Sequence, residues 1–115
     1  MITFELYREQ GGRYYYKLIN EFIYSVLLSD ASLKRDKALN DIETVKKNIE
    51  KGSNIEVRKT RNGDFYFNIR NTEGRIVGSS CLFSTVQNLY QELNEIKSNI
   101  STAQLIEKVN YNLSV

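Results

Sequence analysis

Apolar and polar residues follow a clear pattern in the first half of this chain. Their alternation predicts three successive strands, at residues 4–6, 14–18 and 26–28. Gly11-Gly12 lies between the first two strands and is typical of a hairpin turn, because glycine adopts a positive φ without strain. The period then changes from two to about 3.6 residues. This change predicts a helix whose buried side is Leu39, Ile42, Val45 and Ile49.

The second half shows the same succession. It predicts strands at residues 55–57, 65–69 and 76–77, with Asn62-Gly63 as the first turn. Ser84, with Gln87 three positions later, fits the capping box at the start of a helix. The short alternation in residues 103–115 predicts a further strand or a short helix. The predicted buried side of the second helix is Val86, Leu89, Tyr90, Leu93, Ile96 and Ile100.

The two halves align with each other without a gap. A shift of 51 positions places residues 4–49 over residues 55–100. We therefore predict a single domain over residues 1–115, built of these two repeats and a tail at 103–115. Its predicted fold class is α+β, with two tandem strand-strand-strand-helix repeats forming one antiparallel sheet and both helices on one face. Identical pairs are Glu5/Glu56, Gly12/Gly63, Tyr15/Tyr66, Asn20/Asn71, Val26/Val77, Ser29/Ser80, Lys46/Lys97, Asn48/Asn99 and Ile49/Ile100.

Composition excludes several kinds of catalytic and metal site. The 115 residues include no His and one Cys, and their formal net charge is +2. Without His the chain cannot form a Ser-His-Asp triad, a Cys-His dyad or a His-based metal site. One Cys forms neither an internal disulfide nor a thiolate zinc site. We therefore expect no catalytic residue, no cofactor and no metal, and the composition favours a non-enzymatic protein.

The sequence also favours a cytoplasmic location. Acidic Glu5 comes early, and no apolar signal-peptide core follows it. The longest apolar stretch, at residues 26–28, is far shorter than the ~20 residues that span a membrane. The two repeats can cover each other's apolar surfaces, which favours a monomer. Pairing of the outer strands into a homodimer stays open.

One candidate binding face follows from the alternation. Tyr14 and Tyr16 belong to the buried side of their strand, so the residues between them face outward. If both helices cover one face, the other face is open and carries Tyr7, Tyr15, Lys17, Arg58, Tyr66, Asn68 and Arg70. The simplest interpretation is an ordinary solvated sheet face. Mixed charge and tyrosine suit a protein contact, and aromatic residues among cations suit single-stranded nucleic acid, although Glu5 and Glu56 would repel phosphate.

Three other groups have plainer interpretations. The three cations in residues 58–61 could hold a phosphate or an acidic partner. The favoured interpretation is an edge strand, where cations discourage pairing between sheets. Gly78-Ser79-Ser80-Cys81 leads to a helix start, where backbone N–H groups could bind an anion and give Cys81 thiolate character. The favoured expectation is a buried or half-buried thiol, since no general base accompanies it. The carboxylates on the predicted helices are expected to be solvated, because no cleft brings them together in the sequence. These are Asp41, Glu43, Glu92 and Glu95.

Both halves contain a series of short motifs in the same order and at similar spacing. The first half shows Tyr14-Tyr15-Tyr16-Lys17-Leu18, Asn20, Ser29 and Val45-Lys46-Lys47-Asn48. The second half shows Asn62-Gly63, Phe65-Tyr66-Phe67-Asn68-Ile69, Gly74, Gly78-Ser79-Ser80 and Ile96-Lys97-Ser98-Asn99. This ordered spacing resembles the YegP-like family, small bacterial proteins grouped under a domain of unknown function. The resemblance implies a fold of paired three-strand-plus-helix units, with helices packed across between the units. It implies no catalytic residue.

Overall fold

Seven strands and two α-helices form the described part of the computed structural model, which comprises residues 1–22, 24–30 and 34–109. The first-half elements are β1 (Thr3–Arg8), β2 (Tyr14–Ile19), β3 (Ser25–Leu28) and α1 (Arg35–Lys51). The second-half elements are β4 (Ile55–Lys59), β5 (Phe65–Arg70), β6 (Ile76–Ser80) and α2 (Val86–Asn99). A 3₁₀ turn, η1 (Ile100–Thr102), leads to β7 (Gln104–Val109). The prediction of an α+β fold is confirmed.

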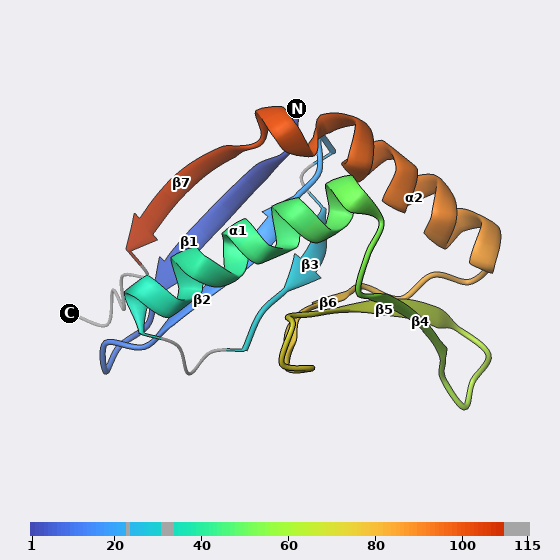
Figure 1. The fold of residues 1–115 in the computed structure, drawn as a ribbon, viewed down its shortest axis with the longest axis horizontal. Coiled ribbons are helices and arrows are strands. Elements are labelled where there is room, and N and C mark those ends of the chain that lie inside the picture. Colours follow the sequence, from blue (N-terminus) through green and yellow to red (C-terminus); the bar gives the residue numbers. More distant parts are fainter. Residues whose placement is uncertain (23, 31–33, 110–115) are drawn as a thin grey trace.

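All seven strands belong to one sheet, in the order β4-β5-β6-β3-β2-β1-β7. Neighbouring strands are antiparallel except β7, which runs parallel to β1 (Figure 1). The prediction of a wholly antiparallel sheet is therefore wrong at this edge. The reason is that η1 ends beside the start of β1, where the Gln104 N–H donates to the Ile2 carbonyl at 3.3 Å. β7 therefore begins at the same end of the sheet as β1, and the two strands run in the same direction.

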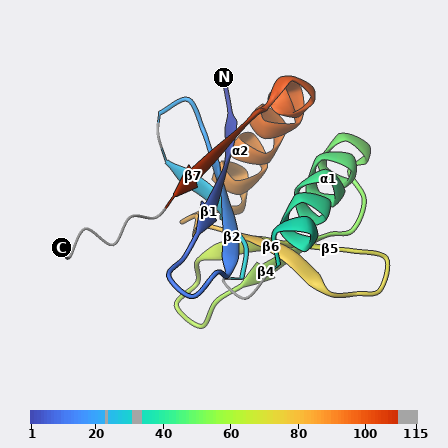
Figure 2. The ribbon, with the colours of Figure 1, turned by 90° about the vertical axis from the view of Figure 1, so that its left-hand side faces the viewer.

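The two halves of the sheet meet at a short junction. β3 and β6 pair through only Leu27 with Ser80 and Leu28 with Ser79. The sheet turns strongly at this junction, and Figure 2 shows both helices together on the same side of it. A buried hydrogen bond reinforces the junction, because the Tyr16 hydroxyl donates to the carbonyl of Val77.

The core lies between the helices and the inward side of the sheet. Tyr16 is fully buried and Tyr14 is partly buried against the core, as predicted. Tyr90 is 48% exposed, so the prediction that it lies on the buried side of α2 is wrong. The prediction of Ser84 as the helix cap is also wrong by one residue. Thr85 is the cap, since its hydroxyl accepts the Asn88 N–H at 3.1 Å.

Several side-chain hydrogen bonds recur between residues 51 positions apart. The Ser29 hydroxyl accepts the Tyr16 N–H at 2.8 Å, and the Ser80 hydroxyl accepts the Phe67 N–H at 2.9 Å. In the β2–β3 turn, Asn20 Oδ1 accepts two backbone N–H groups, those of residues 22 and 24, at 3.0 Å each. In the β5–β6 turn, Asn71 Oδ1 accepts those of residues 73 and 75, also at 3.0 Å. The two turns are therefore anchored in the same way.

Candidate functional site

The predicted open face carries a compact tyrosine cluster at its β1–β2 end. The rings of Tyr7 and Tyr15 stack with centroids 5.0 Å apart and planes 7° from parallel. Lys17 Nζ lies 5.2 Å from the Tyr7 ring centroid, and Lys108 Nζ lies 6.0 Å from it. The Tyr7 hydroxyl donates to Glu5 Oε1 at 2.7 Å. One ring face of Tyr7 is thus already occupied by its neighbour.

Charges within this cluster compensate each other. Glu5 Oε2 lies 2.6 Å from Lys108 Nζ. Burial alone would raise the pKa of Glu5, but the hydrogen bonds from Lys108 and Tyr7 outweigh it and lower the pKa. Burial, followed by the hydrogen bond to Glu5, raises the pKa of Tyr7 to about 12. At neutral pH the cluster therefore combines a carboxylate with a neutral phenol.

The remaining predicted face residues lie at the other end of the sheet. Arg58 and Arg70 form ion pairs with Glu56, at 3.6 and 3.1 Å. Tyr66 is half-buried, whereas Asn68 is only 5% exposed and accepts the Ser79 hydroxyl at 2.7 Å. β3 and β6 separate β5 from β2, which amounts to about 14 Å at the usual strand spacing. The structure therefore brings together Tyr7, Tyr15 and Lys17, but not the whole predicted set.

Two other expectations have different outcomes. β4 is an edge strand, as the basic run predicted. Cys81 is exposed, so the expectation of a buried or half-buried thiol is wrong. Its pKa is raised, first by desolvation and then by the charge of Glu92. A raised pKa is the opposite of what activates a cysteine as a nucleophile.

Asp41 contradicts the expectation of a solvated carboxylate. Its side chain is only 2% exposed, and its Oδ1 lies 2.7 Å from Arg75 Nη2. Its Oδ2 has no hydrogen-bond partner among the described residues. The reason is tertiary, because this face of α1 packs beside the β5–β6 turn, from which Arg75 reaches across. Asp41 thus joins the helix of one half to a turn of the other.

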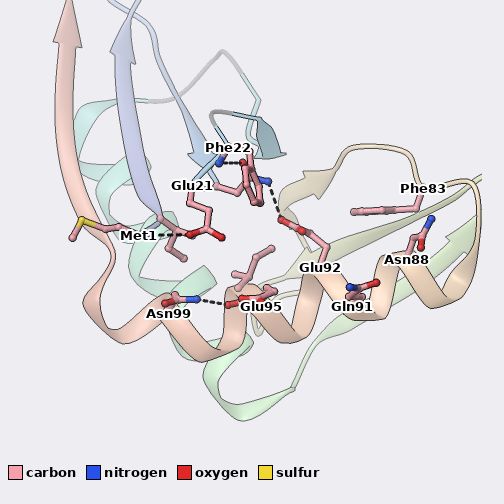
Figure 3. A pocket seen from close by; sticks show the side chains of 12 residues that line it. Met1, Glu21, Phe22, Phe83, Asn88, Gln91, Glu92, Glu95 and Asn99 are labelled. Atoms are coloured by element: carbon pink, nitrogen blue, oxygen red, sulfur yellow. Dashed lines mark hydrogen bonds and ion pairs between the residues drawn. The ribbon is translucent and has the colours of Figure 1, made fainter.

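A groove lies between α2 and the β2–β3 turn, with a volume of about 420 Å³ (Figure 3). Its base includes buried Ile96, and Phe22, which is 71% exposed, stands at its border. Sequence reasoning did not identify this groove, because it joins residues more than 60 positions apart. The lining residues are Met1, Ile2, Asn20, Glu21, Phe22, Phe83, Asn88, Gln91, Glu92, Glu95, Ile96 and Asn99.

The groove carries local negative charge, although the chain as a whole is slightly basic. Its lining includes the carboxylates of Glu21, Glu92 and Glu95, and no Lys or Arg is among the described lining residues. Figure 3 shows Glu21 extending from the turn and Glu92 from α2, so that acidic groups approach from both walls. Glu21 lies 3.7 Å from the amino group of Met1, and Glu92 accepts the Asn20 amide at 3.2 Å.

The lining also contains four amide side chains, two phenylalanine rings and the apolar side chains of Met1, Ile2 and Ile96. The amides both donate and accept hydrogen bonds, as a peptide backbone requires. The surface therefore suits a ligand that combines a cation with peptide-like groups. Within the described residues, no group of three or more Cys, Asp and Glu side chains could hold a metal ion. None of the described helices is long and apolar enough to cross a membrane.

Comparison with known proteins identifies the sequence relatives of this chain. A family model described as a domain of unknown function (DUF1508) matches residues 61–107. A UPF0339 protein of Pseudomonas aeruginosa is 30% identical over 94 residues, which cover 82% of this chain and 86% of the relative. The UPF0339 protein YegP of Escherichia coli is 26% identical over 104 residues, covering 90% of this chain and 94% of that protein.

Two solution NMR structures share the fold. The structure of YegP from Escherichia coli superposes with a TM-score of 0.86 at 23% identity, covering 96% of each chain. The structure of a UPF0339 protein from Shewanella oneidensis superposes with a TM-score of 0.87 at 19% identity, covering 97% of this chain and 95% of that one. The arrangement of the sheet and helices is therefore common to all three proteins.

Proposed function

The chain belongs to the DUF1508 (UPF0339) family, and from this premise we propose that it is a non-catalytic domain that binds a segment of another polypeptide. The proposed binding site is the groove between α2 and the β2–β3 turn. The observation that carries the proposal is the groove itself, whose volume of about 420 Å³ lies within the range of ligand sites.

The lining of the groove supports a polypeptide ligand. Asn88, Gln91 and Asn99 offer amide groups that can pair with a peptide backbone. Phe22 exposes an apolar ring that a partner would cover, as aromatic residues do in protein interfaces. The raised pKa of Cys81 disfavours nucleophilic chemistry at this thiol, because a nucleophile needs its thiolate form.

We further propose that the domain consists of two repeats, at residues 4–49 and 55–100. The recurrent hydrogen bonds of Ser29 and Ser80, and of Asn20 and Asn71, support this. We also propose that the protein works as a monomer in the cytoplasm, where a free cysteine such as Cys81 stays reduced.

A random peptide library displayed on phage tests the proposed function. The immobilised protein should select peptides that bind it in a fluorescence anisotropy titration. Gln91→Trp, which fills the groove, should weaken these peptides by about tenfold. The matched control is Asn94→Trp, an exposed residue on the same helix that is outside the groove lining. Peptides that bind both variants equally, or a selection that yields no binder, would contradict the proposal.

The open sheet face supports a second, separate proposal of a protein contact. Leu28, which pairs with Lys17 across β2 and β3, is 47% exposed on this face beside the tyrosine cluster. The combined change Tyr15→Ala and Tyr66→Ala should abolish partner binding at this face while the fold persists. Partner binding by the double variant that equals that of the wild type would reject this surface. The internal pairing of Glu5 and Lys108 favours a protein contact over nucleic acid.

A further inference from the structure

One difference between the two halves lies where a helix meets a turn of the opposite half. Asp41 on α1 corresponds to Glu92 on α2, since the two are 51 positions apart. By the same shift, Arg75 in the β5–β6 turn corresponds to Tyr24 in the β2–β3 turn. Each helix therefore offers a carboxylate to the turn of the opposite half, but only one of the two turns contains a cation at this position.

In the second-half turn, the chain supplies its own arginine. Asn71 holds the backbone of this turn, because its Oδ1 accepts the Arg75 N–H and its own N–H donates to the Arg75 carbonyl at 2.9 Å. From this position the guanidinium reaches Asp41 at 2.7 Å. The site between α1 and the turn is thus occupied by a carboxylate–guanidinium pair.

In the first-half turn the same backbone anchoring is present without the cation. Asn20 Oδ1 accepts the Tyr24 N–H at 3.0 Å, and the Asn20 N–H donates to the Tyr24 carbonyl at 3.0 Å. The Tyr24 side chain is 68% exposed. Within the described residues, Glu92 accepts a hydrogen bond there from the Asn20 amide alone, at 3.2 Å, and the groove lies beside it. The groove therefore corresponds to the site that Arg75 occupies in the other half.

From this correspondence we infer that the groove binds an arginine side chain of the partner polypeptide. The inference rests on the proposed function, since it names the residue that the polypeptide contributes. The arginine would pair with Glu92 and lie near Glu95, both of which line the groove. Phe22 offers a ring on which a planar guanidinium can stack. A guanidinium suits this site better than an ammonium because its planar fork matches a carboxylate and also stacks on aromatic rings.

The ligand test compares three capped peptides of the form Gly-Gly-X-Gly-Gly, in which X is arginine, citrulline or lysine. Citrulline keeps the shape of arginine and removes its charge. Proton–nitrogen correlation NMR spectra of the labelled protein should show shifts at the side-chain amides of Asn20, Asn88 and Gln91 on addition of the arginine peptide. The citrulline peptide should bind at least about tenfold more weakly, and the lysine peptide should fall between the two. Equal binding of the arginine and citrulline peptides would overturn the inference.

Two variants test the site itself. Tyr24→Arg places an arginine where Arg75 stands in the other half, so it should occupy the groove and weaken the arginine peptide by about tenfold. Tyr24→Gln removes the same ring without adding charge, and it should bind like the wild type. Glu92→Gln should also weaken binding by about tenfold, whereas Glu73→Gln, on the exposed opposite turn, should not. Unchanged binding by both Tyr24→Arg and Glu92→Gln would overturn the inference.

The peptide library separates the failure of this inference from the failure of the proposed function. Selected peptides that lack arginine, and whose binding is lost in Gln91→Trp, would support a polypeptide-binding groove. They would reject the inference that the groove binds an arginine side chain. Failure of both the library and the arginine peptide to bind would reject the two together. Enrichment of arginine in the selected peptides, with loss of binding in Glu92→Gln, would support both.

Discussion

Removal of the Arg75 guanidinium should destabilise the fold strongly, because it leaves the Asp41 carboxylate buried without its cation. Arg75→Met keeps most of the aliphatic side chain and deletes the charge. Breaking a buried ion pair in this way typically costs about 3–5 kcal/mol of unfolding free energy. Asp41 is 2% exposed, but Arg75 is 35% exposed, so water reaches one partner. We therefore place the loss near the lower end, at about 3 kcal/mol.

Urea denaturation followed by circular dichroism measures this loss, with an unchanged slope as the sign of a simple stability effect. For 115 residues the unfolding entropy is about 0.24 kcal/mol/K, so the melting temperature should fall by about 12 °C. The control is Glu43→Gln, which breaks the surface pair of exposed Glu43 with partly buried Lys46 at 3.6 Å and should cost about 0–1 kcal/mol. Adding Asp41→Asn to Arg75→Met should restore part of the stability, because no buried charge is then left unpaired.

The reasoning fails if Arg75→Met costs no more than the Glu43→Gln control. It also fails if Asp41→Asn with Arg75→Met is as unstable as Arg75→Met alone. In either case the pair would not act as a buried link between the two halves, and its use as a template for the groove would lose its energetic basis.

Two further predictions concern the sheet. Ser29→Ala and Ser80→Ala should each cost about 1–3 kcal/mol in urea denaturation, because each leaves a strand N–H of β2 or β5 without its acceptor; a loss at only one of them would show that the two bonds are not equivalent. The pKa of Tyr7, raised to about 12 by burial and by Glu5, means that its contribution to stability is complete below pH 10 and is lost as the pH rises towards 12. The ultraviolet absorbance of tyrosinate follows this titration, and Glu5→Gln should lower the pKa; an unchanged titration in that variant would reject the assigned role of Glu5.

The sequence predicted most of the strands and both helices, because a period of two or about 3.6 reflects which side is buried. It did not predict the parallel entry of β7, since alternation shows that a strand exists but not which neighbour it meets. The exposed position of Tyr90 has a similar cause. Helical spacing marks the apolar side, but the width of that side depends on how closely the helix packs on the sheet.

The sequence did not predict the groove, for a different reason. The sequence predicts Asp41 and Glu92 to be solvated carboxylates on helix surfaces, because nothing in the linear sequence brings them together in a cleft. Their surroundings come from turns of the opposite half, which local spacing does not reveal. One signal was present, however: Asn20 and Asn71 are identical, and acidic residues 41 and 92 correspond at the same shift. Matching polar positions in the two halves could have indicated that both helices contact a turn.

The parallel pairing of β7 with β1 has a consequence for synthesis on the ribosome. Thr3 pairs with Gln104 and Arg8 with Val109, so one of the first strands to emerge must wait for one of the last (Figure 1). Until then β1 presents an unpaired edge to other nascent chains, which is a recognised route to misassembly. The time taken to translate residues 9–109, rather than the stability of the finished domain, then sets how long the growing chain needs protection by chaperones.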